Sequence, residues 1–288
     1  MTLCIAAPYE APRADGKGND APAVVICVDS LAVLGESAGA VSVTDTDKIR
    51  WITPNTTLLI AGQLSAADGV VGEVAPAIRQ YEAANIGTDP DLYVDGLLKV
   101  LKECMQRRKA VLVDEHFKLH HGFSFNEFRE KARERFTEGH YIELWNEVRQ
   151  IHLAADTIVI TFAGDEAVII RTDVQGGVHW EEHYATIGTG SSIANAFLAQ
   201  RDYYEYGMVR DECVYRVFEA KIAAERNVYV GSSTSIFILR ENGALAGFDY
   251  DGEGPLRDAI RQRLRETPEH PIDNKHFTPV ERPKRLRG

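Results

Sequence analysis

The chain has 288 residues, of which 44% are hydrophobic and 26% are charged. These fractions are ordinary for a globular protein and exclude a disordered, collagen-like or disulfide-scaffold chain. A chain of this length buries roughly three quarters of its unfolded surface on folding, enough for one large domain or two small ones. The formal net charge is −11, which argues against general binding to nucleic acid or to an anionic membrane.

The sequence contains no segment that predicts membrane insertion or secretion. Its longest apolar stretches are under about ten residues, whereas a bilayer-spanning helix needs about 20. The N-terminus MTLCIAAPYE has no basic region and only a short apolar run, unlike a signal peptide. We therefore expect a cytoplasmic protein.

The four cysteines are widely spaced and form no CxxC motif: Cys4, Cys27, Cys104 and Cys213. This spacing does not indicate a zinc cluster or a redox pair, and disulfides are not expected in a reducing compartment. We expect buried thiols.

The first 62 residues have the pattern of a series of short strands. Residues 3–7 are apolar, and residues 8–22 are rich in Pro, Gly and charge, which predicts a loop. Residues 23–28 (AVVICV) form a continuous apolar run typical of a strand buried on both faces. Short apolar runs follow at 31–34, 41–43, 48–52 and 57–61. Together they predict hairpins rather than βαβ units.

Four helices are predicted between residues 66 and 154. The first, 66–84, contains Pro76, which should kink the helix or mark its start. The second opens at Asp89-Pro90, and the third follows a capping box of Ser124 and Glu127. Two apolar helix faces are expected: Leu92, Leu97, Leu98 and Leu101 on the second helix, and Ile142, Trp145, Val148 and His152 on the fourth helix, 141–154.

Strands are predicted again at 157–162, 167–171 and 178–187, followed by helices at 191–203 and 211–226. A hairpin of 235–240 and 244–248 precedes a last helix that starts near Pro255. This order, with no internal repeat, favours antiparallel sheets with helices outside them. Two such sheets packed together form an α+β, four-layer αββα sandwich.

We expect one such domain over residues 1–250, with a helical insertion at about 105–155. Residues 251–288 would form a C-terminal helix and a polar, basic tail. A tail of this kind is usually solvated, and docking to a partner is the alternative interpretation.

Thr2 is a candidate catalytic residue, because removal of Met1 would expose it at the N-terminus. A threonine hydroxyl is a weak nucleophile and needs an adjacent base, which the chain's own α-amine can provide. That amine has a pKa of about 7.7–8, close to working pH. The apolar strand at 3–7 would hold Thr2 in place.

Three further residues fit this chemistry. Asp29 follows the strand 23–28, and Lys48 begins the apolar run KIRWI. A lysine that enters a sheet core needs an acidic partner, and we expect that partner to be Asp29. The Lys48 cation of this pair would favour the alkoxide form of the Thr2 hydroxyl. Gly62 stands at a strand end, where its N–H is a candidate donor to an oxyanion.

With these residues the sequence resembles the β-type subunits of the proteasome and the related peptidase subunit of the bacterial two-component ATP-dependent protease. The resemblance covers residues 2–62 and about 157–248, and the order of the motifs carries it. The motifs are Thr2 with Ala6, Asp29 after an apolar strand, Lys48 at the head of a later strand, Ala61-Gly62 at a strand end, Gly188-Thr189-Gly190-Ser191 opening a helix, and residues 223–231, from a helix to Gly231.

The resemblance implies a role for each residue of the set. Thr2 would be the nucleophile and, through its amine, the general base. Lys48 would lower the pKa of the Thr2 hydroxyl, Asp29 would orient Lys48, and the Gly62 N–H would bind the oxyanion. The implied reaction is amide hydrolysis through an acyl-enzyme ester, without a metal or organic cofactor.

The resemblance also implies neighbours and partners. Thr189, where the family usually has Ser, and Ser191 would lie near the amine. The substrate would be a peptide or another amide, and the chain would form a homo-oligomer, of which a ring is one form. No feature of the sequence identifies an ATPase partner.

Two further positions depart from the family pattern. Asn227 stands where the family usually has Asp, and Val230 stands where it has Ser. Both normally set the hydrogen bonding of the amine. A catalytically inert scaffold or binding subunit is therefore an alternative function, and a small-molecule amidase is a second alternative. Cys4 as a nucleophile would be out of phase with the family pattern.

The histidines at 116, 120 and 121 suggest one other kind of site. His116 and His120 lie one helical turn apart, a spacing found in zinc sites. The motif HExxH is absent and the sequence marks no third ligand. We interpret these histidines as solvated or packed residues of the insertion.

Overall fold

The structure is a computed structural model. It describes residues 3–11, 21–29, 31–33, 40–42, 48–200, 210–227, 229–232, 234–241, 245–250 and 255–265, so Thr2 and the C-terminal tail lie outside the described residues. None of the described helices has the length and apolar character needed to cross a bilayer.

The first antiparallel sheet places the N-terminal strand between two neighbours. Its strand order is β10-β1-β2-β11-β12. The bounds are β1 (Leu3–Ala11), β2 (Ala21–Asp29), β10 (Ala185–Gly188), β11 (Thr234–Arg240) and β12 (Leu245–Tyr250). Leu3 lies opposite Gly188, and Cys4 lies opposite Val28.

The loop predicted at 8–22 is wrong at both ends, because the hairpin pairing continues to Ala11 opposite Ala21. Pro8 is compatible with this longer strand. The described pairing between β1 and β10 ends at Ala6, so Pro8 lies at a local edge of the sheet, where proline is tolerated.

The second antiparallel sheet has the order β5-β6-β7-β8-β9. Its bounds are β5 (Ile49–Trp51), β6 (Thr57–Gly62), β7 (Ala155–Ala163), β8 (Glu166–Thr172) and β9 (Val178–Glu181), while β3 (Leu31–Val33) and β4 (Ala40–Ser42) form a separate pair. The single strand predicted at 178–187 is two strands in different sheets. The exposed Glu182 and His183 lie between them.

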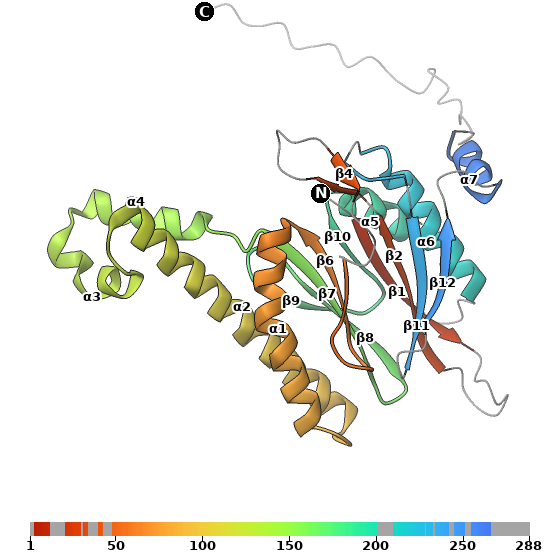
Figure 1. The fold of residues 1–288 in the computed structure, drawn as a ribbon, viewed down its shortest axis with the longest axis horizontal. Coiled ribbons are helices and arrows are strands. Elements are labelled where there is room, and N and C mark those ends of the chain that lie inside the picture. The colour runs from red at the N-terminus through yellow and green to blue at the C-terminus, as the bar shows by residue number, and fades with distance from the viewer. Residues whose placement is uncertain are drawn as a thin grey trace, which may run out of the picture.

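Side chains from both sheets meet in one apolar cluster, which includes Cys4 and Ala6 of β1 and Ala61 and Ile158 of the second sheet. The alternate residues of β1 point the other way, because successive side chains of a strand face opposite sides. Leu3 and its neighbours Ile5 and Ala7 pack in a second cluster, with α5 (Ser191–Gln200) and α6 (Arg210–Ala224). The fold is therefore α+β with two facing antiparallel sheets (Figure 1).

The outer face of the second sheet carries α1 (Leu64–Ala84) and α2 (Pro90–His121). Helix α1 continues through Pro76. Asp89 caps α2 as predicted by accepting the N–H groups of Asp91 and Leu92. The apolar face predicted for α2 is wrong at Leu92, which is 65% exposed. The buried face repeats at three and four residues through Leu97 and Leu101, and Leu92 is out of phase with it.

Beyond the sheets, α3 (Phe125–Arg135) and α4 (Glu138–Gln150) follow the far end of α2 (Figure 1). The capping box is confirmed, since Ser124 Oγ accepts from the Glu127 N–H at 3.2 Å and Glu127 Oε2 accepts from the Ser124 N–H at 2.8 Å. The face predicted for α4 is wrong in part: Leu144 is its buried residue, Ile142 is exposed, and His152 follows the helix end. The last described helix is α7 (Pro255–Arg265).

Candidate active site

Asp29 is a buried carboxylate at the end of β2. Its Oδ1 accepts the N–H of Leu3 at 3.1 Å, and its Oδ2 accepts the N–H of Gly231 at 2.9 Å. A buried carboxylate is costly unless donors surround it, so these bonds are what allow an acid in this strand. They also fix the orientation of Asp29 relative to the first described residue of the chain.

Lys48 is the cationic partner of Asp29, as the sequence predicts. The buried Nζ donates to Asp29 Oδ1, as an ion pair, and to the Asp29 backbone carbonyl. The Lys48 carbonyl accepts the N–H of Ile60 at 3.0 Å, which ties the lysine to β6. The predicted pair is therefore confirmed as a contact.

The nitrogen of Leu3 marks where the N-terminal residue joins the site. Thr2 lies outside the described residues, but it is covalently linked to this nitrogen, which donates to Asp29. One residue further along, Cys4 Sγ donates to the Ile60 carbonyl at 3.5 Å. The backbone of Ile60 thus contacts both Lys48 and the N-terminal strand.

Gly62 ends β6 two residues after Ile60, at a φ of +124° that favours glycine. A Cβ at this position would lie 2.4 Å from the carbonyl oxygen of Ala154 and 2.7 Å from the Cα of Ala155. A side chain is therefore excluded, and the backbone there stays unshielded. The binding of an oxyanion by the Gly62 N–H stays a prediction.

The segments around Thr189 and Asn227 meet beside Leu3. The Asn227 side-chain amide donates to the Thr189 carbonyl at 3.1 Å. A Cβ on Gly190 would lie 2.6 Å from Val230 Cγ2 and 3.5 Å from the Leu3 Cβ, which shows how closely these backbones approach. Val230 therefore lies against Gly190, and Asn227 is hydrogen-bonded to Thr189. Here Val230 is buried and supplies an apolar contact.

Comparison with known proteins bears on the fold alone. No family model matches the sequence, and a search of curated proteins gives no match. Among solved structures, the Gly-1 mutant of Anbu from Hyphomicrobium sp. strain MC1 matches with a TM-score of 0.58 and 13% sequence identity. The match covers 92% of this chain and 96% of that one.

The chain has an Anbu-like fold. The resemblance inferred from the motifs is confirmed as a likeness of fold.

Behind the Asp29 pair, the Anbu-like fold contains a second buried charge cluster centred on Glu225. This carboxylate pairs with Lys221 at 2.6 Å, with Arg261 at 3.0 Å and with Arg257. Lys221 and Arg257 are buried, and burial lowers the pKa of both. The cluster holds three cations on one carboxylate.

The Glu225 cluster is connected to Asp29 through the backbone of Gly231. Lys221 Nζ donates to the Gly231 carbonyl at 2.5 Å, and Arg257 Nη1 donates to the Ser232 carbonyl at 2.7 Å. The N–H of Gly231 is already a donor to Asp29. The sequence analysis missed this cluster. The position of Lys221 inside the apolar run AKIAA indicates the cluster, because a lysine in a buried run needs an acidic partner, as Lys48 does.

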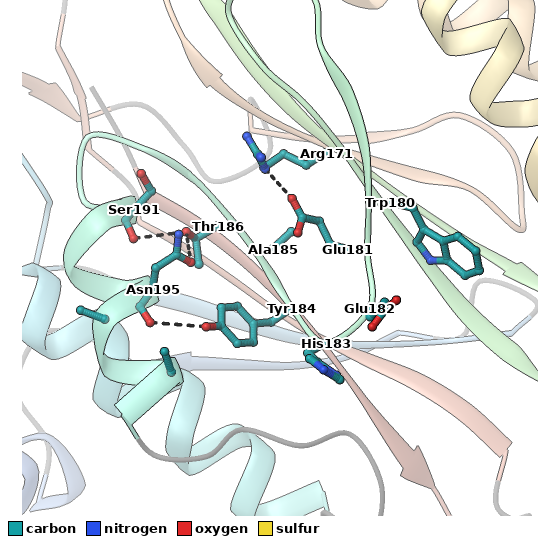
Figure 2. A pocket seen from close by; sticks show the side chains of 12 residues that line it. Arg171, Trp180, Glu181, Glu182, His183, Tyr184, Ala185, Thr186, Ser191 and Asn195 are labelled. Carbon is teal, nitrogen blue, oxygen red and sulfur yellow. Dashed lines mark hydrogen bonds and ion pairs between the residues drawn. The ribbon is translucent and has the colours of Figure 1, made fainter.

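A groove of about 830 Å³ lies next to these segments, between β10, β9 and the start of α5 (Figure 2). Ser191 and Thr186 line it, and Thr186 Oγ1 donates to Asn195 Oδ1 at 2.7 Å. On the opposite side Arg171 pairs with Glu181 at 2.7 Å. Polar and charged groups thus surround a hollow whose lining includes Ser191, two residues after Thr189.

Proposed function

We propose that this protein is an N-terminal threonine amidohydrolase of proteasome-like type that cleaves peptides. The observation that carries the proposal is the Asp29 carboxylate, which accepts both the Lys48 ammonium and the Leu3 N–H. This arrangement brings a buried cation to the residue that directly follows Thr2. The Anbu-like fold supports the same proposal.

The proposed reaction starts after Met1 is removed. The Thr2 hydroxyl attacks the substrate carbonyl and gives its proton to the α-amine of Thr2, while the Lys48 cation favours the alkoxide. The Gly62 N–H stabilises the oxyanion of the tetrahedral intermediate. The carbon–nitrogen bond then breaks, and the leaving amine takes the proton.

The acyl-enzyme ester is hydrolysed by water that the α-amine activates. In this scheme Thr189 and Ser191 lie near the amine and help to orient it. The proposed chemistry needs no metal or organic cofactor. The groove beside Ser191 is the surface we assign to the substrate, because its polar lining suits a peptide backbone.

The finer architecture is part of the same proposal. We infer a four-layer αββα sandwich, supported by the cluster between the sheets and by the separate helix clusters on their outer faces. We further propose one domain over residues 1–250, cytoplasmic location and a homo-oligomer of this chain. A ring and an ATPase partner would be consistent with the Anbu-like fold.

An inert subunit is the second candidate function, and Val230 favours it. Its buried contact with Gly190 stands where the family has a hydroxyl. Asn227 supplies a neutral amide in place of a carboxylate. The same fold would then bind partners without hydrolysis.

The test is the chemical state of Thr2. We expect intact-mass spectrometry to find Met1 absent and a threonine-directed electrophile to label Thr2. Thr2→Ala should lower peptide turnover by more than about 10³-fold, because it removes the nucleophile. Thr88→Ala, at an exposed threonine, is the matched control and should leave turnover unchanged.

The outcomes separate the candidate functions. Retained Met1 would overturn the catalytic proposal, because an acylated nitrogen cannot act as the base. A Thr2→Ala variant that matches wild type would support the inert subunit. Turnover of small amides without turnover of a peptide library would identify a small-molecule amidase.

A further inference from the structure

The helices at the far end of α2 form an arm with its own small core. Four buried residues define this core: Val113, Phe117, Phe128 and Leu144. Figure 1 shows α3 and α4 lying away from both sheets, at the far end of α2. The proposed hydrolysis uses no residue of this arm, so its polar groups need a separate explanation.

Three metal-binding side chains converge on the surface of the arm. His121 Nε2 lies 2.7 Å from Glu147 Oε2, and His116 Nε2 lies 3.1 Å from the same oxygen. The three donor atoms all lie within 4.8 Å of one another, and no other group of three such donors occurs among the described residues. Glu147, on α4, is the third donor that the sequence did not mark.

The ring positions are fixed by packing. The His121 ring packs against Phe117, at 5.3 Å between ring centroids, and against Phe123, at 5.8 Å. His116 packs against His120 at 4.5 Å. His120 is exposed, so the pair that faces Glu147 is spaced five residues apart, instead of the four suggested by the sequence.

We propose that His116, His121 and Glu147 bind a divalent cation of the zinc class. Two imidazole nitrogens and one carboxylate oxygen are ligands that zinc prefers, with water in a fourth position. Their side chains are 31%, 20% and 39% exposed, so an ion and its water can reach them from solvent. The proposal does not rest on the hydrolytic function.

The ion would join two parts of the arm that are distant in sequence. His121 is the last residue of α2, and Glu147 lies in the third turn of α4. Coordination replaces two hydrogen bonds to one oxygen with bonds to one cation, which needs neutral imidazoles. Bound metal would therefore stabilise the packing of α4 on α2.

The experiment is a zinc titration of the untagged, full-length protein after treatment with a chelator. We expect one equivalent to bind by calorimetry, and the unfolding temperature to rise with zinc, because a ligand of the native state stabilises it. Cobalt(II) should bind at the same site and give the visible absorption of a four-coordinate ion.

Two variants and a matched control make the titration specific. His121→Ala and Glu147→Gln should weaken zinc binding at least about tenfold and abolish the rise in unfolding temperature, since changes outside the ligand shell alone cost about 10–100-fold. Glu147→Gln keeps the size of the side chain, so it tests coordination without a cavity. His140→Ala should bind like wild type, because His140 pairs with Glu143 in the same arm but lies outside the donor group.

Two results would overturn the proposal. One is a wild-type protein that binds no stoichiometric zinc or cobalt. The other is a Glu147→Gln variant that binds as tightly as wild type, which would make the cluster a set of hydrogen bonds only. Circular dichroism of each metal-free variant checks that the arm remains helical, so a loss of binding is assigned to the ligands.

Discussion

At the scale of single residues, Asp29 connects the ends of several chain segments. One carboxylate oxygen receives Lys48 and the Leu3 N–H, and the other receives the Gly231 N–H. A buried ion pair is favourable only when such additional hydrogen bonds satisfy its remaining capacity. Asp29 therefore accepts donors on both carboxylate oxygens and orients its neighbours, while the proposed mechanism assigns the chemical step to Thr2.

Lys48→Met tests the cation directly. Turnover should fall by about 10²–10⁴-fold, because the variant loses the charge that activates the nucleophile. The free energy of unfolding should fall by about 3–5 kcal/mol, since the buried Asp29 carboxylate loses its cationic partner Lys48. Enzyme kinetics and chemical denaturation measure the two effects.

A double variant separates the two effects of losing Lys48. Asp29→Asn combined with Lys48→Met removes both charges, so it should recover much of the lost stability without recovering turnover. Lys99→Met, at an exposed lysine of α2, is the control and should change neither quantity. Wild-type turnover in Lys48→Met would refute the assigned role.

At the scale of elements, the turn before α5 and the segment after α6 depend on a close backbone approach. Gly190 has no Cβ, and Val230 fills the space in front of it. The backbone φ of Gly190 is outside the left-handed region, so an alanine at this position would be opposed only by its contact with Val230. The contact positions both segments beside Leu3.

A double-mutant cycle tests that approach. Gly190→Ala should destabilise the fold by about 1–3 kcal/mol through overpacking. Val230→Ala should cost about 1–3 kcal/mol through the lost buried methyl groups. The double variant should lose less than the sum, with a coupling of about 0.5–3 kcal/mol in denaturation experiments. Additive losses would show that the two residues are not in contact.

The Glu225 cluster is an element-scale support for the same site. Glu225→Gln leaves Lys221 and Arg257 without their anion, so we expect a loss of about 3–5 kcal/mol in the free energy of unfolding. Turnover should fall as well, because Lys221 and Arg257 hold the carbonyls that position Gly231 on Asp29.

Glu212→Gln is the control for this prediction. Glu212 lies on α6, the helix that ends just before Glu225, but its pair with Arg216 is on the surface, so its loss should cost less than about 1 kcal/mol. Thermal unfolding measures the stability of both variants. Equal losses of stability would show that the buried Glu225 pairs contribute no more than the surface pair of Glu212.

The sequence predicts elements well where local chemistry decides them. The caps at Asp89 and Ser124 follow from side-chain bonds to nearby backbone, and both are confirmed. Errors occur where distant contacts decide. Leu144 is buried because α4 packs on α2 and α3, and the strand run 178–187 divides because its halves pair with different sheets.

The candidate site shows the same distinction. Lys48 in an apolar run requires an acid, so its pairing with Asp29 was predictable without the structure. Glu225 and Glu147 were not identified, because their partners include residues on other helices. A sequence shows that a buried charge needs a partner, but the packing of helices decides which one.

At the scale of the whole molecule, each sheet has two outer strands in the described chain. Trp51 of β5 and Trp180 of β9 stand half-exposed at opposite edges of the second sheet. Half-exposed tryptophans at sheet edges suit contacts with further copies of the chain, where aromatic residues are enriched.

We therefore expect mass photometry to detect a defined multiple of the chain mass at micromolar concentration, with tryptophan fluorescence changing on dilution. A species of one chain mass at all concentrations would contradict the proposed homo-oligomer. Thr2→Ala should assemble like wild type, because it changes the proposed chemistry and none of these edges.

The four cysteines give the molecule a set of internal reporters. All are buried thiols, as predicted, and they are distributed over three apolar clusters: Cys4 in the cluster between the sheets, Cys27 and Cys213 in the cluster that includes α5 and α6, and Cys104 in the cluster that includes α1 and α2. Burial raises the pKa of the Cys27 and Cys104 thiols, which further suppresses their reactivity. An electrophile intended for Thr2 therefore meets no exposed thiol on the folded protein. The alkylation rate of each cysteine therefore reports how often the apolar cluster around it opens to solvent.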